Sequence, residues 1–291
     1  MTPAGWTAGD LPTFAGRTAI VTGANSGLGR ATAAELARVG AHVILACRNV
    51  DKGAEAAAGM VGDVEVRPLD LQSLVSVREF ADTITAVDVL INNAGIMAVP
   101  YTLTRDGFES QIGTNHLGHF ALTNLLLPRI RDRVVTVSSL THWAGRVSLN
   151  DLNWKARPYS AWPAYGQSKL ANLLFTSELQ HRLNAVGSAV KSHAAHPGYS
   201  ATNLQVRTGN PAGGKLWLTA NRLAGTSAEF GAAPTLYAAS ADLAPNTFIG
   251  PRFGARGPVG EVGRSPRARD AETANRLWRL SEKLTGIEFP L

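Results

Sequence analysis

The chain has 291 residues, of which 45% are hydrophobic and 17% are charged. That length supports one sizeable core and excludes three ordinary domains, so we expect a single domain over residues 1–291. The single cysteine, Cys47, excludes an internal disulfide and any metal cluster built on several thiolates. The net charge of +6 is spread along the chain, so a phosphate-bearing small ligand accounts for it as well as nucleic acid does.

The first seventeen residues contain neither the basic segment nor the apolar segment of an export signal. No stretch of the sequence reaches the roughly 18 consecutive apolar residues of a membrane span. We therefore expect a cytoplasmic protein without a membrane anchor.

Short apolar runs rich in β-branched residues predict strands, in chain order at 18–21, 42–46, 64–66, 87–91, 134–137 and 189–194. Between them, apolar residues recur three or four apart, which predicts helices at 28–39, 51–60, 74–85, 108–127 and 164–186. Alternating strands and helices favour right-handed crossovers and a parallel sheet covered on both faces. We therefore predict an α/β fold, a single doubly wound Rossmann-type domain with about seven strands.

The last third of the chain is less regular. From about residue 199 to about residue 270 the sequence is rich in glycine, proline and asparagine, broken by one helix near 228–239, and we expect this region to form the substrate loop. An amphipathic pattern predicts a C-terminal helix over about 271–284. The arginines between Arg252 and Arg279 favour a mobile, solvated lid over a nucleic-acid surface.

The first predicted strand runs directly into the sequence TGANSGLG, and a helix follows at once. Glycines in this context allow a tight turn and let a pyrophosphate approach the backbone amides at the positive end of the helix. An ordinary glycine-rich turn is the alternative. The loop is predicted to bind a dinucleotide through Gly23, Asn25, Ser26, Gly27, Leu28 and Gly29.

Where the second strand ends, an NAD-dependent protein would carry an acidic residue for the ribose 2′-hydroxyl. This sequence has Cys47, Arg48 and Asn49 there, and the Arg48 guanidinium suits a 2′-phosphate. We therefore predict NADP(H) over NAD(H), with a solvated surface arginine as the alternative. Asp70, followed by Leu71 in the cofactor site, is expected either to bind the adenine amino group or to cap the helix that starts near residue 73.

The fourth and fifth strands end in residues that suit a ligand site. The small residues Asn93, Ala94 and Gly95 let a cofactor approach the backbone, although they also suit an ordinary turn. The fifth strand delivers Ser139 to the carboxyl edge of the sheet, where open α/β sheets bind their ligands.

Tyr165 and Lys169 lie four residues apart in a helical segment, so their side chains leave the same face. A free phenol has a pKa of about 10, and an adjacent ammonium draws that pKa down. Tyr165 is then the predicted acid or base and Lys169 lowers its pKa, while Ser139 hydrogen-bonds the substrate oxygen as negative charge develops. Chance spacing on an ordinary helix is the alternative.

Taken together, TGANSGLG, NNAG, the serine after the fifth strand, YGQSK at 165–169 and HPG at 196–198 resemble the short-chain dehydrogenase/reductase superfamily over nearly the whole chain. Within it, SSLTHWAGRVSLNDLNW and ANRLWRLSEKLTG resemble the branch of the retinol dehydrogenases and WW-domain oxidoreductases. The resemblance implies NADP(H)-dependent interconversion of a carbonyl and an alcohol. It also implies that Asn115 is a helix-kink residue anchoring a water relay to Lys169, and that Pro197, Gly198 and Thr202 belong to the cofactor site.

The resemblance does not identify the substrate, because we expect neither the membrane anchor of animal retinol dehydrogenases nor WW modules here. A lipophilic aldehyde or ketone, or the matching alcohol, is the expected substrate. The long segment between the predicted catalytic serine and tyrosine would shape its site, with four aromatic residues as apolar contacts or as anchors of the loop. These are Trp143, Trp154, Tyr159 and Trp162.

Other classes of function are less well supported. A non-catalytic NADP(H) sensor of the same fold would need the glycine loop and Arg48 but none of the three predicted catalytic residues, all of which are present. His116 and His119 are three apart on a predicted helix without a third ligand, so we expect no metal site. Nucleic acid is not an expected partner, and both a monomer and a homo-oligomer stay open.

Overall fold

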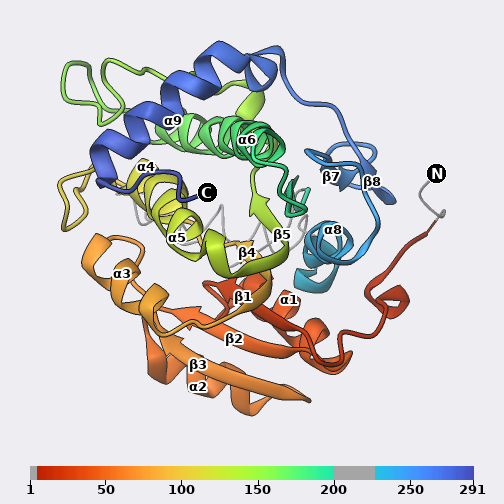
Figure 1. The fold of residues 1–291 in the computed structure, drawn as a ribbon. Coiled ribbons are helices and arrows are strands. Elements are labelled where there is room, and N and C mark those ends of the chain that lie inside the picture. Colours follow the sequence, from red (N-terminus) through yellow and green to blue (C-terminus); the bar gives the residue numbers. More distant parts are fainter. Residues whose placement is uncertain (1–4, 199–226) are drawn as a thin grey trace, which may run out of the picture.

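The computed structural model describes residues 5–198 and 227–291. Within these residues the centre is an eight-stranded sheet in the order β3-β2-β1-β4-β5-β6-β7-β8, parallel except for the last strand (Figure 1). The strands are β1 (Thr18–Thr22), β2 (His42–Cys47), β3 (Asp63–Pro68), β4 (Val87–Asn92), β5 (Ile130–Val137), β6 (Lys191–Ala195), β7 (Phe248–Pro251) and β8 (Val259–Glu261). The predicted doubly wound α/β fold is confirmed.

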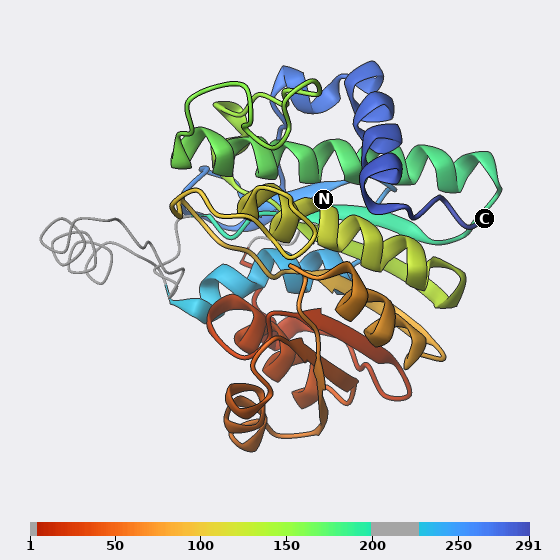
Figure 2. The ribbon, with the colours of Figure 1, turned by 90° about the vertical axis from the view of Figure 1, so that its left-hand side faces the viewer.

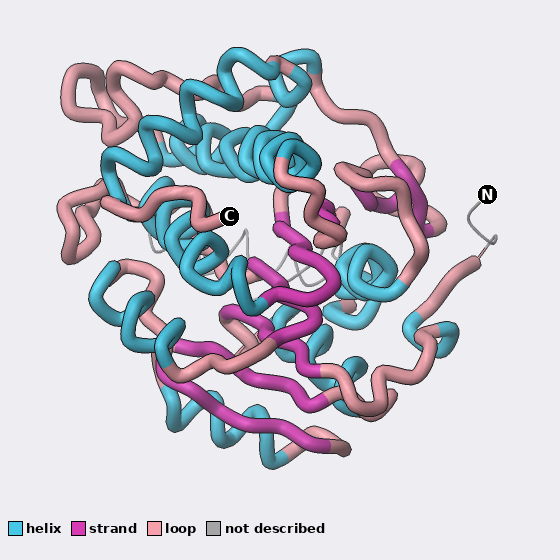
Figure 3. Tube along the Cα trace, in the orientation of Figure 1, coloured by secondary structure: helices cyan, strands magenta, loops and turns pink. Residues whose placement is uncertain are grey.

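Helices cover both faces of this sheet, which Figure 3 shows as a central band of strands between helical layers. One face carries α3 (Leu74–Asp82), α5 (Gly118–Leu126) and α6 (Ala161–Ala185), with α9 (Ala271–Thr285) packed on α6 (Figures 1 and 2). The other face carries α1 (Gly27–Arg38), α2 (Val50–Ala58) and α8 (Ala228–Ser240). Among these described helices, none combines the length and apolar character needed to cross a bilayer.

The central strands are apolar because both of their faces are buried. Ile20 of β1 and Leu90 of β4 pack with the α3, α5 and α6 layer, whereas Val21 and Ile91, one residue further along, pack with the α1 and α8 layer. All four side chains are fully buried. Burying one such side chain stabilises the fold by roughly 1.5–3 kcal/mol, so these runs hold the sheet between its two layers.

Two parts of the chain differ from expectation. The helix predicted at 108–127 is interrupted, with α4 (Ser110–Ile112), a π-helical turn η2 (Gly113–Leu117) and then α5. The irregular region before residue 270 contains α8, β7 and β8, and the predicted mobile lid over 252–279 is wrong. Arg264 is 9% exposed and Trp278 is 2% exposed, so this segment is part of the packed structure. The two short, glycine-flanked strands carry too few residues for a clear alternation.

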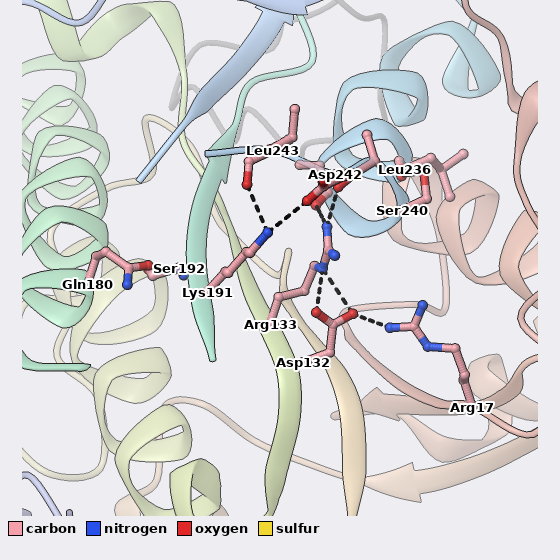
Figure 4. A network of polar contacts seen from close by, with 12 residues as sticks. Arg17, Asp132, Arg133, Gln180, Lys191, Ser192, Leu236, Ser240, Asp242 and Leu243 are labelled. Carbon is pink, nitrogen blue, oxygen red and sulfur yellow. Dashed lines mark hydrogen bonds and ion pairs between the residues drawn. The ribbon is translucent and has the colours of Figure 1, made fainter. Parts of the chain in front are cut away.

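A network of polar contacts lies at the amino-terminal ends of the strands, opposite the carboxyl ends of the sheet (Figure 4). Arg133 of β5 is 7% exposed and donates to the carbonyl oxygens of Ala238, at 3.2 Å, and Ala241, at 2.7 Å, at the end of α8. Its Nε also contacts the Asp132 carboxylate, which pairs with Arg17. The buried cation thus satisfies carbonyls that the helix itself leaves without donors.

We expect Arg133→Met to lower the free energy of unfolding by about 2–3 kcal/mol, because the substitution leaves the α8 carbonyls without their charged donor and removes one of the two cations that contact Asp132. Urea unfolding followed by circular dichroism measures this difference. Arg131→Met is the matched control, since Arg131 lies two residues earlier on the same strand and is exposed. A loss of equal size in the two variants would contradict the role given to Arg133.

His193 of β6 is fully buried beneath α8, and neither of its ring nitrogens has a hydrogen-bond partner among the residues that the structure describes. Burial, with the positive charges of Arg133 and Lys191, lowers the pKa of His193 to about 4. In the unfolded chain His193 is protonated below about pH 6.5, whereas in the folded protein it is protonated only below about pH 4. His193 therefore does not reduce the free energy of unfolding above about pH 6.5, and it reduces that free energy progressively as the pH falls from 6.5 to about 4.

We expect His193→Leu to be more acid-resistant than the parent protein. At pH 5 the penalty carried by His193 amounts to about 2 kcal/mol, which an apolar side chain without a proton site does not have. The difference in unfolding free energy between variant and parent should therefore shift by that amount in favour of the variant between pH 7.5 and pH 5. An unchanged difference at the two pH values would count against the buried neutral histidine.

Candidate active site

A cleft of about 770 Å³ runs along the carboxyl ends of β1, β2, β4 and β5, the position where open α/β sheets bind their ligands. Most of the predicted cofactor residues line it. Gly198 ends the described stretch and is not among the lining residues, and Thr202 lies outside the described residues. The lining residues that were predicted are Gly23, Asn25, Ser26, Gly27, Leu28, Gly29, Arg48, Asn49, Asp70, Leu71, Asn93, Ala94, Gly95, Tyr165, Lys169 and Pro197.

The glycine loop has the geometry that a pyrophosphate needs. Gly23 has a φ of +67°, a left-handed conformation that favours glycine. A Cβ on Gly29 would lie 2.5 Å from the Gly23 carbonyl oxygen and 2.5 Å from the Nδ2 atom of the Asn93 side chain, so only a hydrogen atom fits there. Ser26 is the N-cap of α1 but makes no side-chain capping bond, which leaves the first amides of the helix to a ligand. The loop therefore fits a dinucleotide.

Two cations stand at the end of β2. Arg48 and Lys52 are exposed and line the cleft, and their side chains make no hydrogen bond or ion pair with the described residues. Asn49 accepts a hydrogen bond from the Lys52 amide at 2.9 Å and so begins α2 between them. Asp70 is the one carboxylate among the described lining residues. Lys52 was not predicted from the sequence. Its spacing of four residues from Arg48, at the start of a predicted helix, would have placed the two side chains on the same side.

Asp70 does not cap the helix that follows it. Its Oδ1 accepts a hydrogen bond from the Gln72 amide at 3.0 Å, and Ser73 is the N-cap of α3. The capping alternative is therefore wrong, because a closer residue takes that place. The contact between Asp70 and an adenine stays a prediction.

Ser139, Tyr165 and Lys169 come together beside the cleft. Tyr165 and Lys169 project from α6, 5% and 4% exposed, with the Lys169 Nζ 5.7 Å from the centre of the Tyr165 ring. Ser139 follows β5, and its side chain is placed to act on the Tyr165 hydroxyl, whose pKa it lowers slightly against the larger effect of burial. The Lys169 Nζ donates to the Val137 carbonyl at 3.1 Å. The arrangement suits proton transfer to an oxygen held between Ser139 and Tyr165.

Burial sets the protonation of this group. It raises the pKa of Tyr165 to about 12, against a smaller lowering by the Ser139 hydrogen bond, and it lowers the pKa of Lys169 to about 8. The expected lowering of the Tyr165 pKa by Lys169 is therefore wrong for this structure. The ammonium is directed to the Val137 carbonyl, and removal of the phenol from water dominates. Tyr165 keeps its proton across neutral pH and can donate it.

Asn115 lies in the π-helical turn η2, behind the lining residues. Its Oδ1 accepts from the Ile96 amide at 2.9 Å, and its Nδ2 donates to the Ile96 carbonyl at 3.0 Å and to the Ser168 hydroxyl at 2.9 Å. A Cβ on Gly95 would meet the Asn115 Oδ1 at 3.2 Å and the Lys169 Nζ at 3.4 Å. Asn115 therefore lies close to Lys169, and the water relay between them stays a prediction.

The four aromatic residues of the 140–163 segment divide into two pairs. Trp154 is 8% exposed and packs edge-on against Tyr159, whose hydroxyl bonds the Val99 carbonyl at 2.9 Å. These two anchor the loop. Trp143 and Trp162 are 52% and 49% exposed, and the Trp162 ring lies 6.3 Å from that of Tyr165. Of the four, Trp162 is the one that is both exposed and packed against Tyr165.

Sequence analysis also missed cleft residues that follow β3 and β4, because no local motif marks them. They include Gln72, Ile96, Thr102, Ser110 and Thr114. The histidines at 116 and 119 are buried within helix packing. No group of three or more His, Cys, Asp or Glu side chains able to hold a metal occurs in the described ranges 5–198 and 227–291.

Comparison with known proteins agrees with this geometry. Residues 17–212 match the family model of the short chain dehydrogenases. The chain is 44% identical to human retinol dehydrogenase 13 over 96% of its length and 87% of that protein. A crystal structure of an uncharacterized protein from Mycobacterium Paratuberculosis has 64% identity and a TM-score of 0.89, covering 99% of this chain and 100% of the other. The Pseudomonas aeruginosa RhlG/NADP active-site complex has 25% identity and a TM-score of 0.62, covering 82% of this chain and 95% of the other.

Proposed function

Because the chain belongs to the short chain dehydrogenase family and is an oxidoreductase acting on CH–OH or C=O groups, we propose that it uses NADP(H) to interconvert a lipophilic aldehyde or ketone and its alcohol. The observation that carries this proposal is the meeting of Ser139, Tyr165 and Lys169 at one end of a cleft that fits a dinucleotide. A protein that only binds the nucleotide has no need of these three side chains.

The preference for NADP(H) is supported by charge. Arg48 and Lys52 stand at the end of β2 without partners among the described residues, and no carboxylate stands there to repel a 2′-phosphate. A guanidinium and an ammonium can together hold a dianion by charge-assisted hydrogen bonds. One structural relative carries NADP in its active site.

When bound, the nicotinamide supplies or accepts the hydride. In reduction, the Tyr165 hydroxyl donates a proton to the substrate oxygen, and the Ser139 hydroxyl stabilises the charge that develops there. Lys169, whose Nζ lies 5.7 Å from the centre of the Tyr165 ring, would hold the nicotinamide ribose beside the proton donor. In oxidation the same residues act in reverse.

The proposed substrate class rests on the half-exposed indole ring of Trp162, which offers apolar area 6.3 Å from the Tyr165 ring. The relative named a retinol dehydrogenase supports a lipophilic alcohol or aldehyde. Trp162 lies at the start of α6, and the loop before it is held by the packing of Trp154 against Tyr159 and by the hydrogen bond from the Tyr159 hydroxyl to the Val99 carbonyl.

The test is a titration of the purified protein with NADPH and with NADH, followed by absorbance at the nicotinamide band with medium-chain and isoprenoid aldehydes and ketones. Tighter binding of NADPH and substrate-dependent oxidation support the proposal. Tight binding of NADPH without turnover of any compound favours a nucleotide sensor of the same fold. Failure to bind either nucleotide would overturn the proposal.

A further inference from the structure

The turn that follows β4 is held by hydrogen bonds at both of its ends. At the first end, the amides of Asn93 and Ala94 both donate to the Thr22 hydroxyl oxygen at 2.9 Å. At the second end, Ile96 exchanges two hydrogen bonds with the Asn115 side chain, at 2.9 and 3.0 Å. Thr22 ends β1 and Asn115 lies in η2, so the two anchors come from parts of the chain 93 residues apart.

His119 joins these two anchors and closes a ring. Its Nε2 lies 2.9 Å from the Thr22 hydroxyl, and its Nδ1 lies 3.1 Å from the main-chain oxygen of Asn115. The imidazole is 1% exposed. The ring of hydrogen bonds therefore runs from Thr22 through the turn to Asn115 and back through His119.

The partners of His119 determine its protonation. A carbonyl oxygen only accepts, so Nδ1 carries the proton that bonds Asn115. Burial, with the nearby positive charge of Lys169, lowers the pKa of His119 to about 4, so Nε2 has no proton at neutral pH. The Thr22 hydroxyl has one proton, and Nε2 at 2.9 Å is a closer acceptor for it than the Ile91 carbonyl at 3.3 Å. Its two lone pairs accept from the amides of Asn93 and Ala94. Every polar group of the Thr22 side chain is used.

This closed series of hydrogen bonds surrounds the part of the turn that faces both the cofactor cleft and Lys169. Asn93, Ala94 and Gly95 line the cleft, and a Cβ on Gly95 would lie 3.4 Å from the Lys169 Nζ. A small movement of this turn changes the distance between the cleft wall and Lys169. Hydrogen-bond networks of this kind in a buried site hold one geometry when every member is satisfied.

We infer that His119 is a positioning residue for the reaction of the proposed function. Through its contact with Thr22, it fixes the position of the cleft wall at Asn93 and Ala94. Through its contact with the Asn115 carbonyl, it fixes the position of Asn115 relative to Lys169. The two contacts of one imidazole thus serve cofactor binding and proton transfer separately. His116, three residues earlier, does neither, because its Nε2 bonds Ser281 of α9 at 3.0 Å.

Two conservative variants separate the contacts. His119→Asn keeps a donor near the Nδ1 position for the Asn115 carbonyl but removes the acceptor for Thr22. His119→Gln keeps an acceptor near the Nε2 position but removes the donor to Asn115. We expect His119→Asn to weaken NADPH binding about tenfold with little change in kcat, and His119→Gln to lower kcat about tenfold with little change in NADPH affinity.

The measurements are NADPH titration by fluorescence, kcat and KM for a substrate of the parent protein, and the melting temperature. Opposite effects of the two variants on affinity and kcat support the inference. If both variants lose affinity and kcat in proportion to their loss of melting temperature, His119 has only a structural role and the inference is wrong. His116→Gln is the control, and its effects should fall on the melting temperature alone.

A readout without substrate separates this inference from the proposed function. Nitrogen-15 spectra of histidine-labelled protein should show His119 protonated at Nδ1 and bare at Nε2 between pH 8 and pH 5.5. A proton on Nε2 would overturn the inference even in an active enzyme. If the parent protein neither binds NADPH nor turns over any substrate, the proposed function fails, and the role of His119 fails with it.

Discussion

Tyr165→Phe should lower kcat by about 10³-fold while NADPH affinity stays within about twofold. The substitution removes only the hydroxyl and leaves the buried ring against Trp162. The proton donor is lost, and the contacts of the aromatic ring are kept. Single-turnover kinetics with NADPH and an aldehyde identified in the substrate panel measures the effect on the chemical step.

Tyr101→Phe is the matched control for this change. Its hydroxyl donates to the Asn153 carbonyl at 3.4 Å and its side chain is 41% exposed, so the same chemical change should alter kcat less than twofold. Turnover that survives in Tyr165→Phe at more than about a tenth of the parent rate would remove Tyr165 from the proposed mechanism.

The pKa values also predict the pH profile of the parent enzyme. Because burial raises the pKa of Tyr165 to about 12, the donor stays protonated throughout, and the rate of reduction should be flat from pH 6 to about pH 7, below the pKa of Lys169. Lys169 has a pKa of about 8, so it loses its positive charge above that pH and the rate should fall. A rate of reduction that rises above pH 8 would contradict this assignment.

The second large effect concerns the choice of nucleotide. We expect the double variant Arg48→Ala with Lys52→Ala to weaken NADPH binding by at least about 10²-fold, since each side chain would supply a charge-assisted hydrogen bond to the 2′-phosphate. NADH, which has a hydroxyl at that position, should change by less than about threefold. Each single substitution should account for about a tenfold loss of NADPH affinity.

Arg30→Ala is the control for the change in net charge, because Arg30 is exposed on α1 and does not line the cleft. Calorimetric titration with both nucleotides at fixed ionic strength compares the variants. Equal losses for NADPH and NADH would mean that Arg48 and Lys52 contact a part shared by the two cofactors, and the proposed selectivity would be wrong.

Local patterns were enough to predict much of this protein. A glycine loop between a strand and a helix depends on neighbouring residues, so its place at the end of β1 could be read from TGANSGLG. The spacing of Tyr165 and Lys169 places both on one helix face for the same reason. Apolar runs identified the parallel strands β1 to β6, and most clearly the central strands β1, β2, β4 and β5, because burial on both faces leaves a continuous apolar segment.

Only the tertiary structure decided what depends on residues far apart in the chain. The sequence itself established the α/β fold and the types of residue available for chemistry, because these follow from short-range periodicity and motifs. Burial of Tyr165 by distant segments reversed the expected direction of its pKa, and the meeting of β1 with η2 joined Thr22, Asn115 and His119 in one ring. Solvent exclusion and long-range hydrogen bonds arise only when the layers pack, and no local pattern encodes their geometry.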